Sequence, residues 1–194
     1  MTRIVSGEAR GRRLRVPGSG TRPTSDRVRE ALFASIEARL SRDLRDWSRI
    51  RFCDWFAGSG AVALEAWSRG CSHVIAIDSA RSAVTVIDAN VRALGASAQV
   101  KVLRADLNKA VTSAPPEEQP FDVLFADPPY EVTAASVRAL LQRAQESGWV
   151  TSSSLVVVER PGRDPEPPLP VEFLSEDKHT RHYGDSVLWY GHVH

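Results

Sequence analysis

One stretch, residues 121–130 (FDVLFADPPY), constrains the fold strongly because two prolines abruptly stop an apolar run. The first six residues are short, apolar and partly β-branched, which is typical of a buried strand. Pro128 and Pro129 have no N–H group for a sheet hydrogen bond, so the strand must end there. The turn that follows presents the Asp127 carboxylate and the Tyr130 ring. Open α/β sheets bind ligands at the carboxyl ends of their strands, so this turn is a candidate site.

The rest of the chain alternates apolar runs with segments of helical periodicity. We expect strands at 51–56, 73–78, 99–104, 121–126 and 155–159, and a terminal antiparallel pair at 171–176 and 186–191. Helices are predicted over residues 25–40, 62–67, 84–94 and 137–144. Because each crossover between parallel strands needs a helix, the pattern predicts an α/β fold with a mostly parallel, doubly wound sheet of seven strands.

Residues 1–22 are expected to form a basic N-terminal arm, with one main domain over residues 23–194. Apolar residues of the arm could make a short β-hairpin with the arginines on its solvent face; they are Ile4, Val5, Leu14 and Val16. The alternative is a solvated tail. In the helix that follows, Arg27 and Arg29 are expected to be available to solvent or ligand.

The charge is unevenly distributed along the chain, although the formal net charge is only +1. Residues 1–51 hold 13 arginines and 6 acidic residues, whereas the remainder holds 12 basic and 18 acidic residues. A basic arm on an acidic body suggests a polyanionic partner such as a nucleic acid.

The composition is that of a soluble globular protein, with 42% hydrophobic and 25% charged residues among 194. The N-terminus has no apolar segment like that of a secretory signal, and no apolar run is long enough to span a bilayer. Cys53 and Cys71 lack metal-ligand spacing and are interpreted as reduced packing residues of a cytoplasmic protein. No metal site is expected from the histidine spacings.

A glycine-rich loop follows the first predicted strand of the sheet. Residues 58–63 (GSGAVA) fit the nucleotide-binding pattern G-x-G-x-x-G/A, placed after a strand and before a helix. Asp78 ends the next strand, 18 residues beyond Gly60, where a carboxylate can accept hydrogen bonds from ribose hydroxyls. The glycine-rich loop and Asp78 would suit a dinucleotide and S-adenosylmethionine equally well, so they do not distinguish the two ligands.

Two further carboxylates favour S-adenosylmethionine. Asp54 lies four residues before Gly58, where it would repel a pyrophosphate but suit a cationic ammonium and sulfonium, directly or through a water. Asp106 ends the third predicted strand, at the height where an adenine amino group could be recognised. Three carboxylates at three strand ends therefore predict a site for a cationic nucleoside.

The chemistry of residues 127–130 suits the amino group of a nucleobase. The Asp127 carboxylate and the Pro128 carbonyl are two acceptors for the amine hydrogens, which favours a nitrogen with a localised lone pair. Tyr130 would stack on the base. Alignment of the amine with a sulfonium methyl then accounts for much of the catalysis, and the fixed carboxylate stabilises developing positive charge.

Several segments together resemble the RsmD family, bacterial enzymes that methylate N2 of guanine 966 in 16S ribosomal RNA. The resemblance rests on the Asp-Pro-Pro-Tyr turn, on Asp-x-Phe-x-Gly-Ser-Gly at residues 54–60, and on residues 3–7, 11–12, 22–33 and 183–185. It implies a class I methyltransferase fold, S-adenosylmethionine as cofactor, and 16S rRNA in the 30S subunit as partner. No obligate protein partner is evident.

The motifs and the resemblance together assign the candidate site residues. Those expected to be catalytic are Asp127, Pro128, Pro129 and Tyr130. Those expected to bind the cofactor are Pro23, Thr24, Asp54, Ala57, Gly58, Ser59, Gly60, Asp78, Asp106, Leu107 and Asp127. Those expected to contact RNA are Arg3, Arg10, Arg12, Arg13, Arg15, Arg22 and Arg27.

Three alternatives remain open at this point. The nearest is an adenine-N6 methyltransferase acting on DNA or RNA, because the Asp-Pro-Pro-Tyr turn is not specific to guanine. A nicotinamide-dependent dehydrogenase would lack both the Asp54 carboxylate and this turn. A nucleic-acid binder without catalysis would not need Gly58, Gly60, Asp78 and Asp127.

Overall fold

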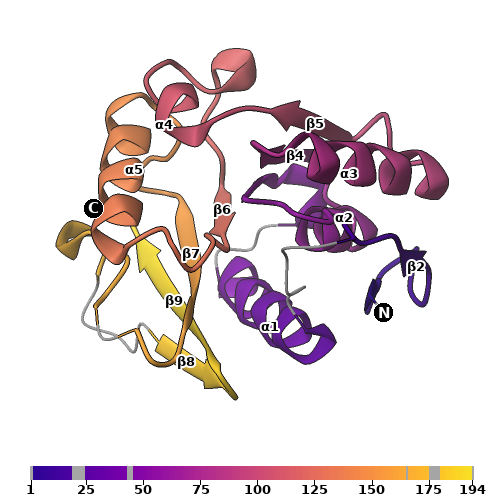
Figure 1. Cartoon of the computed structure of the whole chain (residues 1–194), viewed down its shortest axis with the longest axis horizontal. Helices are drawn as coiled ribbons and strands as arrows, with labels where there is room; N and C mark the ends of the chain where they lie inside the picture. Colours follow the sequence, from indigo (N-terminus) through magenta and orange to yellow (C-terminus); the bar gives the residue numbers. More distant parts are fainter. Residues whose placement is uncertain (1, 19–24, 43–45, 165, 175–179, 194) are drawn as a thin grey trace. The chain divides into compact units, whose positions relative to one another are not determined.

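Figure 1 shows the computed structural model of the chain, which describes residues 2–18, 25–42, 46–164, 166–174 and 180–193. The chain divides into two compact units, Met1–Arg104 and Ala105–His194.

The first unit contains a parallel sheet of three strands in the order β5-β4-β3, each preceded or followed by a helix. Its elements are β1 (Thr2–Arg3), β2 (Arg13–Leu14), α1 (Asp26–Arg42), η1 (Trp47–Arg49), β3 (Arg51–Trp55), α2 (Ala61–Ser68), β4 (His73–Asp78), α3 (Arg81–Leu94) and β5 (Val100–Arg104). The strand and helix predictions for this part of the chain are confirmed to within a few residues. Residues 52–55 and 74–77 are buried, as expected for strands covered on both faces.

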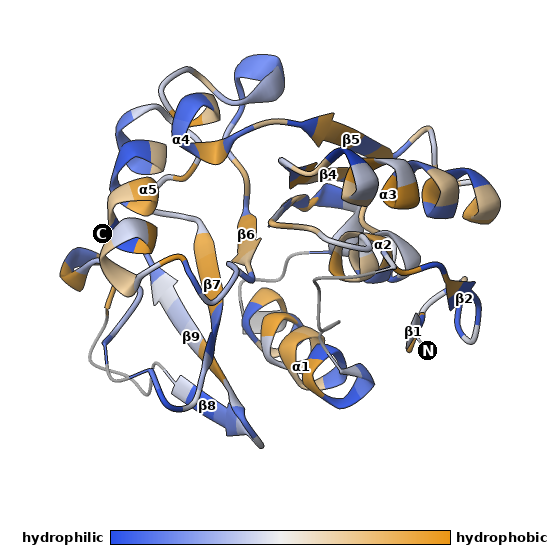
Figure 2. Ribbon diagram, in the orientation of Figure 1, coloured by the Kyte–Doolittle hydropathy of each residue, from blue (hydrophilic) through white to orange (hydrophobic). Residues whose placement is uncertain are grey.

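Helix α1 buries one face, as its periodicity predicts. The hydroxyl of Ser25 accepts a hydrogen bond from the Val28 N–H at 3.2 Å and so caps the helix. The apolar residues at three- and four-residue spacing are all buried, namely Val28, Leu32, Phe33, Ile36 and Leu40. Figure 2 shows both hydrophobic and hydrophilic colours on this helix.

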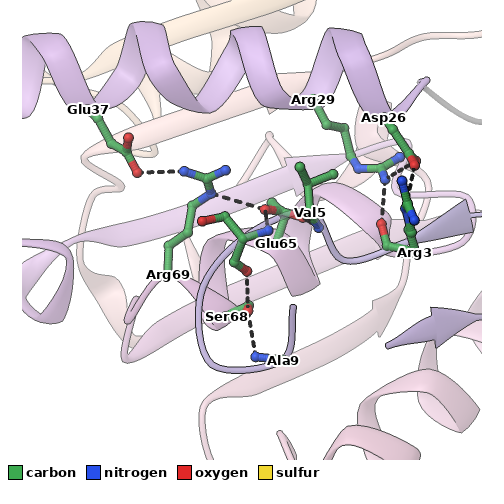
Figure 3. A network of polar contacts seen from close by, with 10 residues as sticks. Arg3, Val5, Ala9, Asp26, Arg29, Glu37, Glu65, Ser68 and Arg69 are labelled. Atoms are coloured by element: carbon green, nitrogen blue, oxygen red, sulfur yellow. Dashed lines mark hydrogen bonds and ion pairs between the residues drawn. The ribbon is translucent and has the colours of Figure 1, made fainter. Parts of the chain in front are cut away.

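The described part of the N-terminal arm is a hairpin packed on helix α2, which decides against a solvated tail for these residues. Strands β1 and β2 pair antiparallel, with Thr2 opposite Leu14. The fully buried Glu65 carboxylate accepts hydrogen bonds from the N–H groups of Val5 at 2.8 Å and Ser6 at 2.9 Å (Figure 3). Ser68 accepts a hydrogen bond from the Ala9 N–H at 3.0 Å. Backbone hydrogen bonds to α2 therefore hold the arm in place.

The prediction for Arg29 is wrong, because this side chain is fully buried. Its Nη2 donates to the Arg3 carbonyl at 2.6 Å and to Asp26 at 2.8 Å (Figure 3). Burying a guanidinium requires such partners, and the incoming arm supplies a backbone carbonyl that helix periodicity cannot reveal. Arg27 is exposed, as expected.

The second unit begins with short helical turns and continues as a mixed sheet in the order β6-β7-β9-β8. Its elements are α4 (Leu107–Ala110), η2 (Pro116–Glu118), β6 (Val123–Ala126), α5 (Ala134–Glu146), β7 (Leu155–Pro161), η3 (Val171–Phe173), β8 (Thr180–Tyr183) and β9 (Ser186–His192). Strands β6 and β7 are parallel, and β9 runs antiparallel to both β7 and β8. Strand β6 is buried throughout and has the hydrophobic colour in Figure 2.

The predicted terminal pair is partly wrong. Strand β9 is confirmed, but its hairpin partner is β8 at Thr180–Tyr183 rather than residues 171–176. Residues 171–173 form a single 3₁₀ turn, in which the Phe173 N–H donates to the Pro170 carbonyl at 3.0 Å. Apolar residues two positions apart at 171 and 173 fit either a strand or this turn, and the fixed φ of Pro170 favours the turn. The β8 sequence is mostly polar, so no strand pattern was visible there.

The seven strands of the two units confirm the mixed α/β fold with a mostly parallel sheet and a terminal antiparallel hairpin. Among the described residues, no helix is long and apolar enough to cross a membrane.

The arm provides a matched pair of glycines that tests its docking. Both Gly7 and Gly11 have positive φ, but a Cβ at Gly7 would overlap the Ser68 carbonyl, whereas a Cβ at Gly11 would meet nothing within 4 Å. We expect Gly7→Ala to destabilise the protein by about 2 kcal/mol more than Gly11→Ala, because only Gly7→Ala adds overpacking to backbone strain. Urea unfolding of both variants measures the difference, and equal midpoints would contradict the docked arm.

Candidate functional site

The glycine-rich loop in the first unit has an unusual backbone. Between β3 and α2, positive φ angles occur at Phe56 (59°), Gly58 (56°) and Gly60 (74°). A positive φ at a bulky residue such as Phe56 is strained and persists only where its surroundings enforce it. A Cβ on Gly60 would lie 2.8 Å from the Ile87 side chain of α3, so this position has no room for a larger residue. Ala57 and Ser59, also in the loop, are buried.

The structure brings Asp78 to this loop. Its Oδ2 accepts a hydrogen bond from the Gly58 N–H at 2.9 Å, and its Oδ1 accepts one from the Ala80 N–H at the same distance. The side chain is half-buried at the end of β4. Asp78 therefore fixes the loop and keeps carboxylate surface available for a ligand.

Asp54 lies beneath the same loop and is only 2% exposed. Its Oδ2 accepts a hydrogen bond from the Ala63 N–H at 3.0 Å, in the first turn of α2. Since the N-cap residue Gly60 has no side chain, the Asp54 carboxyl does the capping. Burial raises the pKa of Asp54 to about 8; the hydrogen bond from Ala63 opposes this rise, and the charge of Asp78 adds to it.

Asn90 is a residue of this region that the sequence patterns did not single out. Its side chain donates to the Ser59 carbonyl at 3.0 Å and exchanges two hydrogen bonds of 2.9 Å with the backbone of Arg15. It thereby joins the N-terminal arm to the glycine-rich loop. A buried polar residue three positions after Ile87, on an otherwise apolar helix face, was the available signal.

The second unit contains the remaining predicted residues. Asp106 is exposed and caps the short helix α4 through the Asn108 N–H at 3.0 Å, while Leu107 is buried. After β6, Asp127 is half-buried and Pro128 is buried, whereas Pro129 is exposed. The Tyr130 side chain is 60% exposed, which is unusual for a large aromatic residue and leaves ring surface for a ligand.

The arginines predicted to contact RNA are exposed wherever the structure describes them. They are Arg3, Arg10, Arg12, Arg13, Arg15 and Arg27. Arg3 pairs with Asp26 at 3.1 Å but keeps 64% of its side chain exposed, and Arg12 donates to the Ala93 carbonyl at 2.9 Å. Arg22, Pro23 and Thr24 lie outside the described residues.

A metal-binding group or a reactive cysteine would be another source of chemistry. The described ranges hold no group of three or more His, Cys, Asp or Glu residues placed to bind a metal ion. Cys53 and Cys71 are both buried and in the thiol form, and burial raises the pKa of Cys53 well above its usual value. Burial and a raised pKa fit the packing role expected of Cys53.

The sequence matches a family model described as Conserved hypothetical protein 95 over residues 2–192. Two curated relatives are similar over most of their length. The putative rRNA methyltransferase YlbH of Bacillus subtilis is 34% identical over 158 residues, which is 81% of each chain. The ribosomal RNA small subunit methyltransferase D of Escherichia coli K12 is 32% identical over 176 residues, which is 88% of this chain and 80% of that one.

Solved structures similar to this chain include further methyltransferases. A hypothetical protein of Thermus thermophilus, TTHA0928, superposes with a TM-score of 0.75 at 33% identity, with all of both chains covered. The putative methyltransferase yhhF of Escherichia coli has a TM-score of 0.77 at 27% identity, covering all of this chain and 98% of that one. An RNA methyltransferase of Salinibacter ruber, solved with S-adenosyl-L-homocysteine, shares the fold at 15% identity, with a TM-score of 0.63 and coverage of 89% and 94%.

The family match over nearly the whole chain, the curated relatives and the class I methyltransferase fold all agree, and the chain belongs to the RsmD family.

Proposed function

We propose that this protein transfers a methyl group from S-adenosyl-L-methionine to the exocyclic N2 of a guanine in 16S rRNA, of the guanine 966 type. The observation that carries the proposal is the exposed Tyr130 ring, three residues after Asp127 in the turn that ends a buried strand, in a chain related to rRNA methyltransferases. An exposed aromatic ring and a carboxylate in one short turn suit a base with an amino group.

The donor set of the first unit fits the cofactor. The Asp78 carboxylate accepts a hydrogen bond from Gly58 in the loop at residues 57–60. The Asp54 carboxyl accepts one from Ala63 in the helix that follows the loop. Asp78 suits a ribose, and the carboxylate form of Asp54 would suit a cationic amino-acid group better than a pyrophosphate. S-adenosylmethionine would supply an electrophilic methyl group on sulfonium. Asp106, Leu107, Pro23 and Thr24 are proposed to complete the binding residues.

The Asp127–Tyr130 turn is proposed to hold the target base. The carboxylate of Asp127 and the carbonyl of Pro128 would accept the two amine hydrogens and orient the nitrogen. Stacking on Tyr130 would contribute about 1–3 kcal/mol to base binding, as in other single-stranded sites. Asp127 would stabilise the positive charge that develops on nitrogen and can take the released proton.

The exposed arginines of the arm would bind RNA phosphates, so binding is expected to weaken as salt rises. We propose that the substrate is 16S rRNA in an assembled or assembling 30S subunit in the cytoplasm. The guanine would have to leave its stack or loop to reach the turn. The docked hairpin supports this role, because it presents several arginines from a fixed backbone.

Product analysis tests the base assignment. The purified protein is incubated with tritiated S-adenosylmethionine and 30S particles from a strain that lacks this activity, and the labelled RNA is digested to nucleosides. We expect label in N2-methylguanosine. Label in N6-methyladenosine would instead support the alternative, an adenine-N6 methyltransferase, and would refute the guanine assignment.

Removal of the Asp127 carboxylate tests the catalytic role. We expect Asp127→Ala to lower methyl transfer by at least about a hundredfold, the scale of one lost transition-state electrostatic contact. Cofactor binding, followed by calorimetry, should stay measurable. Glu131→Ala removes an exposed acid close by in the chain and should leave the rate unchanged. An active Asp127→Ala protein would refute the mechanism.

The raised pKa of Asp54 predicts pH-dependent cofactor binding. With a pKa of about 8, Asp54 is mostly protonated at pH 7, and a cationic ligand favours its carboxylate form. Binding should therefore release a proton and tighten as pH rises from 6 to 8, by up to about tenfold per pH unit. Above the pKa of Asp54, the cofactor affinity should no longer rise with pH, because the carboxyl is already ionised before binding.

Calorimetry in buffers of different ionisation enthalpy measures this proton release. The cofactor's own α-amino group titrates in the same range, so the difference between the wild type and Asp54→Asn is the decisive quantity. We expect less proton release by the variant. Identical release by both proteins would rule out a coupling between Asp54 and the cofactor.

A further inference from the structure

A groove of about 450 Å³ in the second unit is lined in part by Tyr130, and its other lining residues have no role in the chemistry above. Six of its lining residues matter here, namely Tyr130, Thr133, Arg160, Arg163, Asp164 and Glu166. They come from the turn after β6, the start of α5, and the end of β7 with the loop that follows it. The volume is in the range of small-molecule sites, large enough for part of one nucleotide.

The acidic side chains of the groove are already paired with arginines. Asp164 Oδ2 accepts hydrogen bonds from Arg160 Nε at 2.8 Å and Nη2 at 2.5 Å, and this pairing lowers the pKa of Asp164. Glu166 lies 3.3 Å from Arg138 Nη2. Within the described ranges, Arg163 makes no ion pair, so its guanidinium is available to an anion.

The buried guanidinium of Arg160 points to an anionic ligand. Arg160 is only 4% exposed, and its Nη1 has no hydrogen-bond partner among the described residues. Leaving a charged donor buried without an acceptor is costly, and such a group is satisfied when a ligand brings an acceptor. A phosphate oxygen is a natural partner for a guanidinium fork.

Two further features favour an anion at the same place. Thr133 is the N-cap of the 13-residue helix α5 and accepts a hydrogen bond from the Ser136 N–H at 3.2 Å. The first N–H groups of a helix lack intrahelical partners and attract negative charge. Arg163 Cζ lies 5.7 Å from the centre of the Tyr130 ring, so one exposed guanidinium is held beside the proposed base-stacking ring.

We propose that this groove binds the phosphodiester of a nucleotide adjacent to the target base, with Arg163 as its main contact and Arg160, which also lines the groove, as a second cation. The inference rests on the proposed function, because it assigns the RNA backbone to a groove beside the base-binding turn. Tyr130 then has two functions. It stacks on the base, and it positions the Arg163 guanidinium against the neighbouring phosphate.

The test measures binding of fluorescently labelled protein to 30S particles over a range of salt concentrations. Each phosphate contact in single-stranded RNA contributes about 0.7 to the slope of log affinity against log salt. We expect Arg163→Ala to reduce the slope by about 0.7, and Arg163→Lys, which keeps the charge, to restore it. Arg163 is exposed, so neither change should unfold the protein.

Arg181→Ala is the matched control, since Arg181 is also an exposed arginine of the second unit but lies on β8, outside the groove lining. Its slope should match the wild type. An unchanged slope in Arg163→Ala, or an equal loss in Arg181→Ala, would overturn the proposal. Weaker S-adenosylmethionine binding by Arg163→Ala would assign the groove to the cofactor and overturn it as well.

Failure of the underlying function gives a different result. If the wild-type protein methylates no guanine in 30S particles, the proposed function fails whatever the salt slopes are. If it does methylate guanine and the slope of Arg163→Ala is unchanged, only the groove assignment fails.

Discussion

The hydrogen bond from the Ala63 N–H to the buried Asp54 carboxyl is the interaction on which the glycine-rich loop of the first unit depends. It connects the end of β3 to the first turn of α2 through the Ala63 N–H, across a loop with three positive φ angles. The N-cap residue Gly60 has no side chain with which to cap the helix. A larger residue cannot replace it, because its Cβ would collide with Ile87. The acid that caps the helix is thus also the group that the proposed cationic cofactor would ionise, so one side chain serves both the loop architecture and the proposed cofactor binding.

Buried polar groups also fix the arm to the body of the first unit. Glu65 accepts two backbone N–H groups of the arm, and Asn90 bonds to the arm at Arg15 and to the loop at Ser59. These bonds use backbone atoms, so the arginine side chains of the arm stay at the surface. The element proposed to bind RNA and the loop proposed to bind the cofactor are therefore held by neighbouring hydrogen bonds.

Periodicity and turn chemistry predicted most of the fold. The strands at 51–56 and 73–78 and the apolar face of α1 were correct, since local sequence specifies them. The errors fall where tertiary contacts outweigh local pattern. Residues 171–173 became a turn while polar residues 180–183 took the strand, and the buried Arg29 depends on the Arg3 carbonyl, 26 residues away. The hydrogen bonds of Asn90 and Arg160 could not be predicted either. The partners of Asn90 are Arg15 and Ser59, which are distant in sequence. The partner of Arg160 is Asp164, which belongs to no recognised motif.

The sequence by itself determined which residues are candidates for the chemistry: the glycine-rich loop, the strand-end acids and the Asp-Pro-Pro-Tyr turn are local patterns with local physical causes. Only the tertiary structure decided the state of those groups. It buried Asp54 and raised its pKa, left Tyr130 exposed, docked the arm on α2, and placed Arg163 beside the tyrosine ring. Burial, charge pairing and helix capping depend on neighbours brought from elsewhere in the chain, so they follow from folding and not from the motifs.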